Sequence, residues 1–169
     1  DPDLKVLLSK TQEEEDYYVW LEDVGEDLDS NIDIYQGVQE IYIVDKNNRI
    51  IYSTEKSEID SFKGSIVDEI VSERKYLSST YISEKNNVPC FSIGFPAYSS
   101  SGEIIGAVVM EITIDELTKI TSEKIGLKET GDVYLANKEG YMITPARFLK
   151  DNEDFINQKI STEALKCIH

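Results

Sequence analysis

Apolar residues recur at helical spacing through the first thirty residues of the chain. They follow the period of an α-helix at Leu4, Leu7, Leu8, Tyr17, Tyr18, Leu21, Val24 and Leu28. The opening Asp1-Pro2-Asp3 supplies a cap, a proline in the first turn and negative charge at the positive end of the helix dipole. The acidic run 13–16 fits the solvated face of such a helix. We predict one long N-terminal helix that ends in a loop at 29–31.

From Val38 onward the spacing of apolar residues changes to that of β-strands. Residues 40–45 and 49–53 are β-branched and aromatic runs separated by the turn 46–48, which indicates a hairpin. Both faces of the first run are apolar, so we expect a central strand that is covered on two sides. Residues 64–75 predict a short helix that begins at a serine cap.

Three further strands are predicted at 76–83, 89–98 and 104–112. The turns 85–87 and 99–102 contain Asn, Ser and Gly in combinations that favour hairpins. Because short hairpins join antiparallel strands, these runs and the first hairpin predict one antiparallel sheet. A capping-box spacing then predicts a helix from 113 to about 123.

An internal repeat connects the middle of the chain to its C-terminal part. The segment 41–46 (IYIVDK) is echoed by 133–138 (VYLANK), and the return strands keep the same offset of 92 residues. Strand patterns are common, so the match could also arise by chance. If the repeat is real, the second copy lacks its last strands. We therefore divide the chain into a helix and loop at 1–35, a sheet domain at 36–121, and a linker with an incomplete second domain at 122–169.

Composition and charge restrict the class of protein. The chain has 169 residues, of which 40% are hydrophobic, and its formal net charge is −16. This charge disfavours binding to nucleic-acid phosphates and to anionic membrane surfaces, while the apolar content supports a folded core. No run is long enough to cross a bilayer and no signal peptide is visible. Since the chain opens at Asp1 without a Met, we expect it to be part of a longer protein.

Residues suited to catalysis are scarce. His169 is the single histidine, and no phosphate-binding or nucleophile-elbow motif is present. The segment 27–33 resembles the start of a calcium loop, but Ile32 and Val38 occupy the positions of the required glycine and glutamate. The two cysteines have neither metal-site nor disulfide spacing and do not reveal the compartment. We expect no enzymatic activity, no metal and no cofactor.

Polar residues within the predicted strands indicate a candidate ligand site. Ser79, Tyr81 and Ser92 stand where a pure core would be aliphatic, and Glu111 interrupts the apolar run 108–112. Because a partly buried carboxylate requires a partner, Glu111 is predicted to receive a cationic, amine-bearing or hydroxyl group of a ligand. The alternative is that Glu111 lies exposed at the strand end or accepts a hydrogen bond from a loop amide.

The opposite wall of this predicted site would come from the end of the short helix. Arg74 and Tyr76 follow that helix and are candidate ligand-binding residues. Arg74 with Lys75 also fits a solvated helix end, where basic residues are common. Tyr81 fits the lining of a pocket and ordinary core packing equally well.

Three segments resemble a known family of sensor modules. Residues 88–98 (VPCFSIGFPAY) and 102–112 (GEIIGAVVMEI) look like the last hairpin of a Cache domain, the PAS-like extracytoplasmic module of bacterial and archaeal receptors. Residues 130–144 (TGDVYLANKEGYMIT) resemble the opening of the membrane-proximal module in the double-Cache type. The order of stalk helix, distal module, linking helix and proximal hairpin is also similar to that family.

The resemblance implies an α+β fold. This fold has a PAS-like five-stranded antiparallel sheet with a long N-terminal stalk helix, followed by the first hairpin of an incomplete second PAS-like module. In the family the ligand usually lies in the distal module, between the sheet and a loop-plus-helix segment, here 54–76. Glu111 falls where many amino-acid-binding relatives have an aspartate that holds the ligand amine. Their arginine-x-tryptophan-aromatic motif is absent, and Arg74-Lys75-Tyr76 lies too close to Tyr81 to replace it. The resemblance therefore does not imply an amino-acid ligand, and a small carboxylate, another metabolite or no ligand at all stay open.

Two functions from different classes follow. The resemblance implies the periplasmic or extracellular sensor of a membrane-anchored receptor, in the first place a sensor histidine kinase, which binds a small molecule and relays the signal through the stalk helix. The alternative is an interaction module of a chemotaxis receptor or similar protein that binds no ligand and dimerises through the stalk helix. A distal cavity filled by side chains favours the alternative. A cleft with two carboxylates of perturbed pKa would favour a third class, a secreted enzyme.

Overall fold

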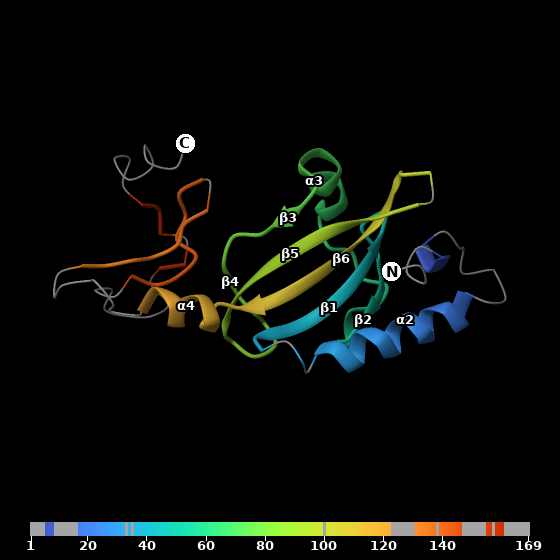
Figure 1. Ribbon diagram of the computed structural model, residues 1–169, viewed down its shortest axis with the longest axis horizontal. Helices are drawn as coiled ribbons and strands as arrows, with labels where there is room; N and C mark the ends of the chain where they lie inside the picture. The colour runs from blue at the N-terminus through green and yellow to red at the C-terminus, as the bar shows by residue number, and fades with distance from the viewer. Residues whose placement is uncertain are drawn as a thin grey trace. The chain divides into compact units, whose positions relative to one another are not determined.

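The computed structural model describes residues 6–8, 17–32, 34, 36–99, 101–122, 131–137, 139–146, 155–156 and 158–160 (Figure 1). Its elements are α2 (Tyr17–Ile32), β1 (Val38–Asp45), β2 (Ile50–Ser53), η1 (Lys56–Glu58), α3 (Ile66–Glu73), β3 (Tyr76–Leu77), β4 (Tyr81–Ile82), β5 (Pro89–Tyr98), β6 (Ile104–Thr113) and α4 (Asp115–Ser122). Cys167 and His169 lie outside these described residues.

The chain forms two compact units, and each is made of two separate segments. Unit 1 contains Asp1–Leu77 and Ser92–Ile112, and unit 2 contains Ser78–Phe91 and Thr113–His169. The predicted three-part division of the chain stays a prediction.

The predicted antiparallel sheet is confirmed, with strand order β2-β1-β6-β5-β3 and with β4 also paired to β5. β1 pairs antiparallel with β2 and β6, and β3 and β4 pair antiparallel with β5. Outside β2, residues 60–61 continue the hydrogen bonding, because Ile50 N donates to Ser61 O and Asp60 N donates to Ile50 O, both at 2.9 Å. The fold is therefore α+β, as predicted.

The strand predicted at 76–83 is two short strands, β3 and β4. The intervening residues turn their polar groups toward other parts of unit 2. Thr80 Oγ1 donates to Ile143 O at 3.3 Å, and Ser79 Oγ accepts from Asn137 Nδ2 at 3.2 Å. Ser79 and Thr80 are therefore outside the strand ladder, and their side-chain hydroxyl groups form hydrogen bonds elsewhere in unit 2.

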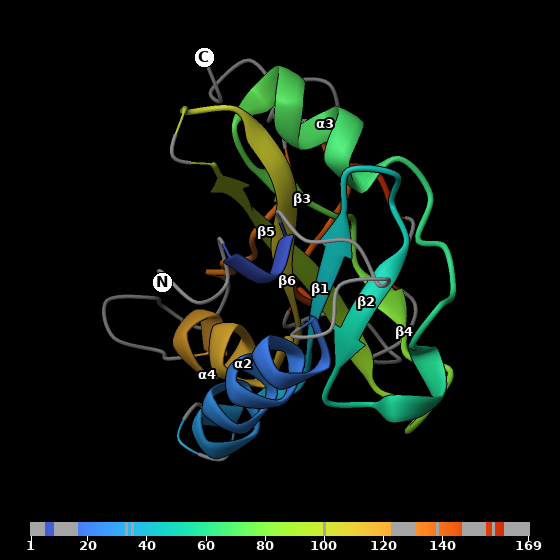
Figure 2. The same ribbon diagram turned by 90° about the vertical axis from the view of Figure 1, so that its right-hand side faces the viewer.

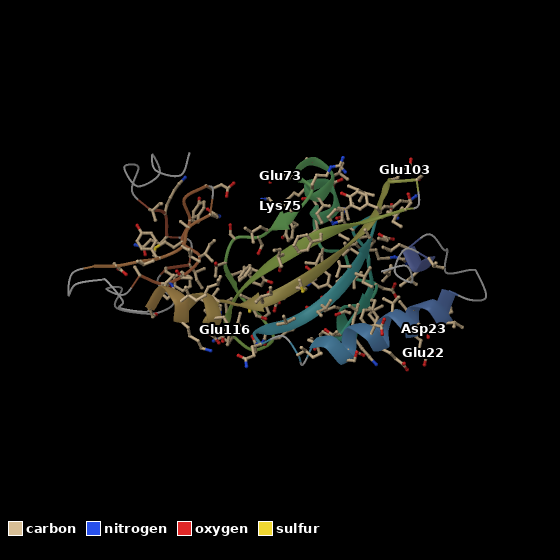
Figure 3. All side chains as sticks on the ribbon, in the orientation of Figure 1. Glu22, Asp23, Glu73, Lys75, Glu103 and Glu116 are labelled. Atoms are coloured by element: carbon tan, nitrogen blue, oxygen red, sulfur yellow. The ribbon has the colours of Figure 1, made fainter. Side chains whose placement is uncertain are left out.

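One face of the unit 1 sheet is covered by α2, which contacts β1 and β2 (Figure 1). The buried cluster on this face consists of Leu7, Val24, Ile43, Ile51 and Tyr52, with Leu8, Leu21, Leu28 and Val108 packed against it. A shift in the β1–β2 register leaves Ile51 unpaired, so Ile51 and its neighbour Tyr52 both join this cluster. On the outer side of α2, Glu22 and Asp23 are exposed to solvent, as Figure 3 shows.

Tyr52 fixes α2 to the sheet. Its hydroxyl donates to Gly25 O at 3.0 Å and to Asp29 Oδ1 at 2.7 Å, and its burial raises its pKa. A Cβ at Gly25 would lie 2.7 Å from the Tyr52 ring, so glycine allows the close approach. The loop predicted at 29–31 is wrong, since α2 continues to Ile32 with Asp29 bound to Tyr52. Residues 9–16 lie outside the described part, so the length of the predicted stalk helix stays a prediction.

The opposite face of the sheet is covered by α3, and Figures 1 and 2 show α2 and α3 on opposite sides of the strands. Its buried cluster consists of Tyr42, Val44, Ile50, Ile66, Val67, Ile70, Ala107 and Val109, with Tyr76 and Ile104 packed against it. Successive residues of a strand point to opposite faces, so Ile43 lies in one cluster while its neighbours Tyr42 and Val44 lie in the other. The prediction that β1 is covered on two sides is confirmed.

The helix predicted at 64–75 is confirmed as α3, but its serine cap is not formed. The side chain of Ser65 makes no capping hydrogen bond. Instead, Asn48 Oδ1, from the turn between β1 and β2, accepts from Val67 N at 2.7 Å, and Asn48 O accepts from Lys63 N at 3.1 Å. The cap is therefore non-local, which a sequence pattern does not reveal.

Replacing Asn48 with alanine is expected to lower the free energy of unfolding by about 1–2 kcal/mol, because α3 loses its cap. Asn48 also has φ of 63°, a conformation that alanine adopts poorly. Urea denaturation followed by circular dichroism measures the change. The control is Asn47→Ala, an exposed position in the same turn, where a change within about 0.5 kcal/mol is expected. Equal losses in the two variants would contradict the role of Asn48.

Unit 2 contains a second antiparallel pairing. Asn137 N donates to Tyr141 O at 2.9 Å and Ile143 N donates to Leu135 O at 2.8 Å. Its buried cluster consists of Ile114, Met142 and Phe155, with Phe91, Tyr134, Ala146, Ile156 and Ile160 packed against it. That this pairing is the first hairpin of a second PAS-like module stays a prediction.

The helix predicted after β6 is present as α4, within the predicted range. The capping box is not formed as expected, because the buried Thr113 hydroxyl has no hydrogen-bond partner. Among the helices that the structure describes, none has the length and apolar character needed to cross a membrane.

Candidate functional site

A cluster of buried polar side chains interrupts the apolar face under α3. Its members, which we call the polar cluster, are Glu40, Tyr42, Ser53, Ser92 and Glu111. Strand alternation places Glu40 and Tyr42 of β1 on this face, and Ser53 of β2 lies opposite Tyr42. The site therefore combines two carboxyl groups with three hydroxyl groups, all in unit 1.

The two carboxyl groups of the polar cluster belong to directly paired residues. Glu40 of β1 is the register partner of Glu111 of β6, and the two are only 1% and 8% exposed. Ser53 Oγ donates to Glu40 Oε1 at 2.5 Å and accepts from Glu55 N at 2.9 Å, so the sheet orients the Glu40 carboxyl group. Two buried carboxyl groups are thus held side by side on the face under α3, where acidic side chains are rare.

Tyr42 lies at the centre of the polar cluster. Its pKa is raised above the ordinary value of 10.0, mainly by burial, and further by the nearby Tyr76, Glu40 and Glu111, whereas a hydrogen bond with Ser92 lowers it. The hydroxyl group therefore keeps its proton at neutral pH and can donate a hydrogen bond. Lys63 Nζ lies 5.9 Å from the centroid of the Tyr42 ring.

Tyr76 borders the polar cluster from β3, and we call the polar cluster together with Tyr76 the candidate site. Its register partner Gly94 leaves room for it: a Cβ at Gly94 would lie 3.1 Å from Tyr76 Cβ and 3.2 Å from Val109 Cγ2. Burial raises the pKa of Tyr76, and the charge of Glu69 on α3 adds to this effect. The Tyr76 hydroxyl is therefore a second protonated donor, close enough to Tyr42 to affect the pKa of Tyr42.

The structure brings together three of the six predicted site residues: Tyr76, Ser92 and Glu111. Arg74 is exposed and ends α3 in a left-handed conformation, with its N–H donating to Ile70 O at 2.8 Å. Its neighbours Glu73 and Lys75 are also exposed, and Figure 3 shows them near α3.

The remaining two predicted residues belong to unit 2. Ser79 is exposed and accepts a hydrogen bond from Asn137, and Tyr81 is half-buried and is the register partner of the buried Cys90. Their part in ligand binding, like that of Arg74, stays a prediction.

Sequence reasoning missed Glu40, Tyr42 and Ser53. The available signal was Glu40 itself, a charged residue in a strand that is predicted to be covered on both faces. Two-residue alternation then puts Tyr42 on the same face. Within the described ranges no group of three or more His, Cys, Asp or Glu side chains could hold a metal ion.

Neither protein-family models nor curated proteins match the sequence, but solved structures do. The V. cholerae histidine kinase DctB sensor domain matches with a TM-score of 0.63 and 12% identity, over 99% of this chain and 62% of its own. An extracellular ligand binding receptor from Desulfohalobium retbaense matches with a TM-score of 0.62 and 17% identity, over 85% of this chain and 26% of its own. The ligand-binding domain of the Campylobacter jejuni chemoreceptor Tlp3 matches with a TM-score of 0.57 and 16% identity, over 95% of this chain and 62% of its own.

The matched DctB and Tlp3 domains are Cache sensor domains. This chain has the Cache fold. At 12–17% identity the likeness to the matched structures is one of fold alone, and the chain spans less than two thirds of the length of each of the three structures above. Periplasmic and extracellular domains of membrane receptors are among the structures that share this Cache fold.

Proposed function

We propose that this chain is the extracytoplasmic ligand-sensing domain of a membrane-anchored signalling receptor, in the first place a sensor histidine kinase, and that the candidate site binds a small molecule. The observation that carries the proposal is the direct pairing of two buried carboxyl groups, Glu40 and Glu111, on the α3 side of a Cache-fold sheet. Carboxyl groups bind ligand groups that supply positive charge or hydrogen-bond donors.

The chemistry of the candidate site selects the class of ligand. Glu40 and Glu111 would accept hydrogen bonds from an ammonium or hydroxyl group, and Tyr42 would donate to an acceptor beside it. Ile70 and Val109 give the site an apolar side. The proposed ligand is therefore a compact molecule with an amine or hydroxyl group on an apolar body. Tlp3, which shares the fold, was solved in complex with 4-methylisoleucine.

Signalling would follow from the packing of the two faces of the sheet. β1 carries Tyr42 toward the candidate site and Ile43 toward the cluster that holds α2. A ligand that favours one position of β1 would therefore shift the population of positions of α2, provided that its affinity differs between them by a few kcal/mol.

A binding screen tests the proposal. Small amines, polyols and carboxylates are compared by thermal shift, and the compounds that stabilise the protein are titrated by calorimetry. Glu111→Gln and Tyr42→Phe are each expected to weaken binding of such a compound about ten- to a hundredfold, because each removes a hydrogen bond in a buried site. The matched control is Glu103→Gln, an exposed glutamate in the same unit (Figure 3), for which unchanged affinity is expected. Saturable binding that persists in a folded Glu111→Gln/Tyr42→Phe double variant would exclude this site.

The second candidate function is a dimerisation module without a ligand, acting through the stalk helix. One observation favours it: Tyr42 is only 4% exposed, so side chains pack closely over this face. This function predicts a concentration-dependent dimer in sedimentation equilibrium together with no stabilising compound in the screen. A monomer that binds a compound would exclude it.

A further inference from the structure

The chain crosses between the two units three times, and each crossing follows or precedes a residue of the candidate site in the sequence. The crossings fall between residues 77 and 78, between 91 and 92, and between 112 and 113. Tyr76 precedes the first by one residue, Ser92 directly follows the second, and Glu111 precedes the third by one residue. Each of these three site residues is thus the last, or the last but one, residue of unit 1 at a crossing.

On the unit 2 side, a residue within three positions of each crossing is held by a hydrogen bond or by the buried cluster of unit 2. Thr80, four residues after Tyr76, hydrogen-bonds to Ile143 O. Phe91, the neighbour of Ser92, packs against the buried cluster of unit 2. Ile114, three residues after Glu111, is a buried member of that cluster, and its N–H donates to Pro89 O at 3.1 Å.

A strand transmits small displacements between residues that are one to four positions apart. Its backbone is extended and held by ladder hydrogen bonds, so a shift of one residue moves its neighbours on the same strand. Close-packed interiors pass strain on because they compress little. A displacement of Ser92 toward or away from Tyr42 therefore reaches Phe91 through one peptide unit.

We infer that unit 2 reads the state of the candidate site through these three crossings, so that a change at Tyr76, Ser92 or Glu111 alters the stability of the hydrogen bonds of unit 2. This inference rests on the proposed function for the identity of the site as a ligand site. The coupling itself is a property of the chain and is tested without any ligand. Binding at the site would then be converted into a change in unit 2, in addition to any shift of α2.

Two serine variants of the full chain provide the test, since Ser92 and Ser53 are both buried members of the polar cluster. Only Ser92 adjoins a crossing. Ser92→Ala is expected to speed amide hydrogen exchange at Ile114, Asn137 and Ile143 about three- to tenfold relative to the slowest amides of β1, the range expected when a coupled residue is changed. Ser53→Ala is expected to leave these rates within about twofold, since its effects stay in unit 1.

Reciprocity supplies a second measurement. Thr80→Val removes the hydrogen bond to Ile143 and is expected to change exchange at Tyr76 and Gly94, because coupling between two sites acts in both directions. Thr144→Val, a buried threonine of unit 2 away from the crossings, is the control. If Ser92→Ala does not fold, Tyr76→Phe replaces it and removes only a hydroxyl group.

The outcomes separate the two proposals. Equal effects of Ser92→Ala and Ser53→Ala on unit 2, or no effect of either, would overturn the coupling whether or not a compound binds. Faster exchange in unit 2 of Ser92→Ala alone would support the coupling even if the binding screen finds no compound. In that case the proposed ligand-binding function would be rejected while the coupling would stand.

Discussion

Gly106→Ala is expected to lower the free energy of unfolding by about 3 kcal/mol, because the added methyl group overfills a closed site. A Cβ at Gly106 would lie 2.4 Å from the carbonyl oxygen of Val44 and 2.9 Å from Leu8 Cδ2. The first neighbour is backbone in the adjoining strand β1, where Gly106 pairs with Asp45, so relief of the clash would disturb the strand ladder. Urea denaturation monitored by circular dichroism measures the loss.

Gly94→Ala is the matched control for Gly106→Ala. The Cβ at Gly94 would meet only side-chain atoms, at 3.1 to 3.3 Å, and side chains can move by a few tenths of an ångström. The expected loss is about 1 kcal/mol, at the low end for overpacking. A Gly106→Ala protein as stable as the Gly94→Ala protein would show that β1 and β6 separate more easily than the pairing indicates.

Ile70→Ala is expected to lower the free energy of unfolding by about 3 kcal/mol, because it leaves a cavity under α3. Ile70 is fully buried in the cluster between α3 and the sheet, whereas its neighbour Val71 is 54% exposed. Val71→Ala removes a similar amount of apolar side chain from the same helix and is expected to change stability by less than about 0.5 kcal/mol. Thermal and urea denaturation of both variants make the comparison.

Ile70→Ala also tests how the candidate site is held. Since α3 covers the face that carries Tyr42, a loosened α3 is expected to weaken binding of any compound that the screen finds, while Val71→Ala leaves its affinity unchanged. A destabilised Ile70→Ala protein with unchanged affinity would mean that α3 contributes to stability but not to the site.

The elements with a clear local signal were predictable. β5 has the predicted bounds, because an alternating run between two turn signals defines a strand without help from the rest of the chain. The hairpin of β1 and β2 was predicted for the same reason. Non-local hydrogen bonds account for the differences: Tyr52 binds Asp29 and extends α2, Asn48 caps α3, and Thr80 bonds to Ile143 and divides one predicted strand into two.

The candidate site was predictable in part. Glu111 and Ser92 are polar residues in apolar strands, and this contrast identifies them from sequence. Glu40 escaped notice because it stands at the beginning of its run, where a charged residue normally marks the end of a strand. Its importance depends on its register with Glu111, and the pairing of β1 with β6 joins residues about seventy positions apart.

The margins of the sheet determine how two copies of the chain could associate. At Ile50, the first residue of β2, residues 60 and 61 already occupy the outer backbone groups, and β3, at the other margin, has only two residues. Both features protect a sheet from edge-to-edge growth. Strand addition from a second chain is therefore disfavoured, and dimers or higher assemblies are expected to form through helices or loops.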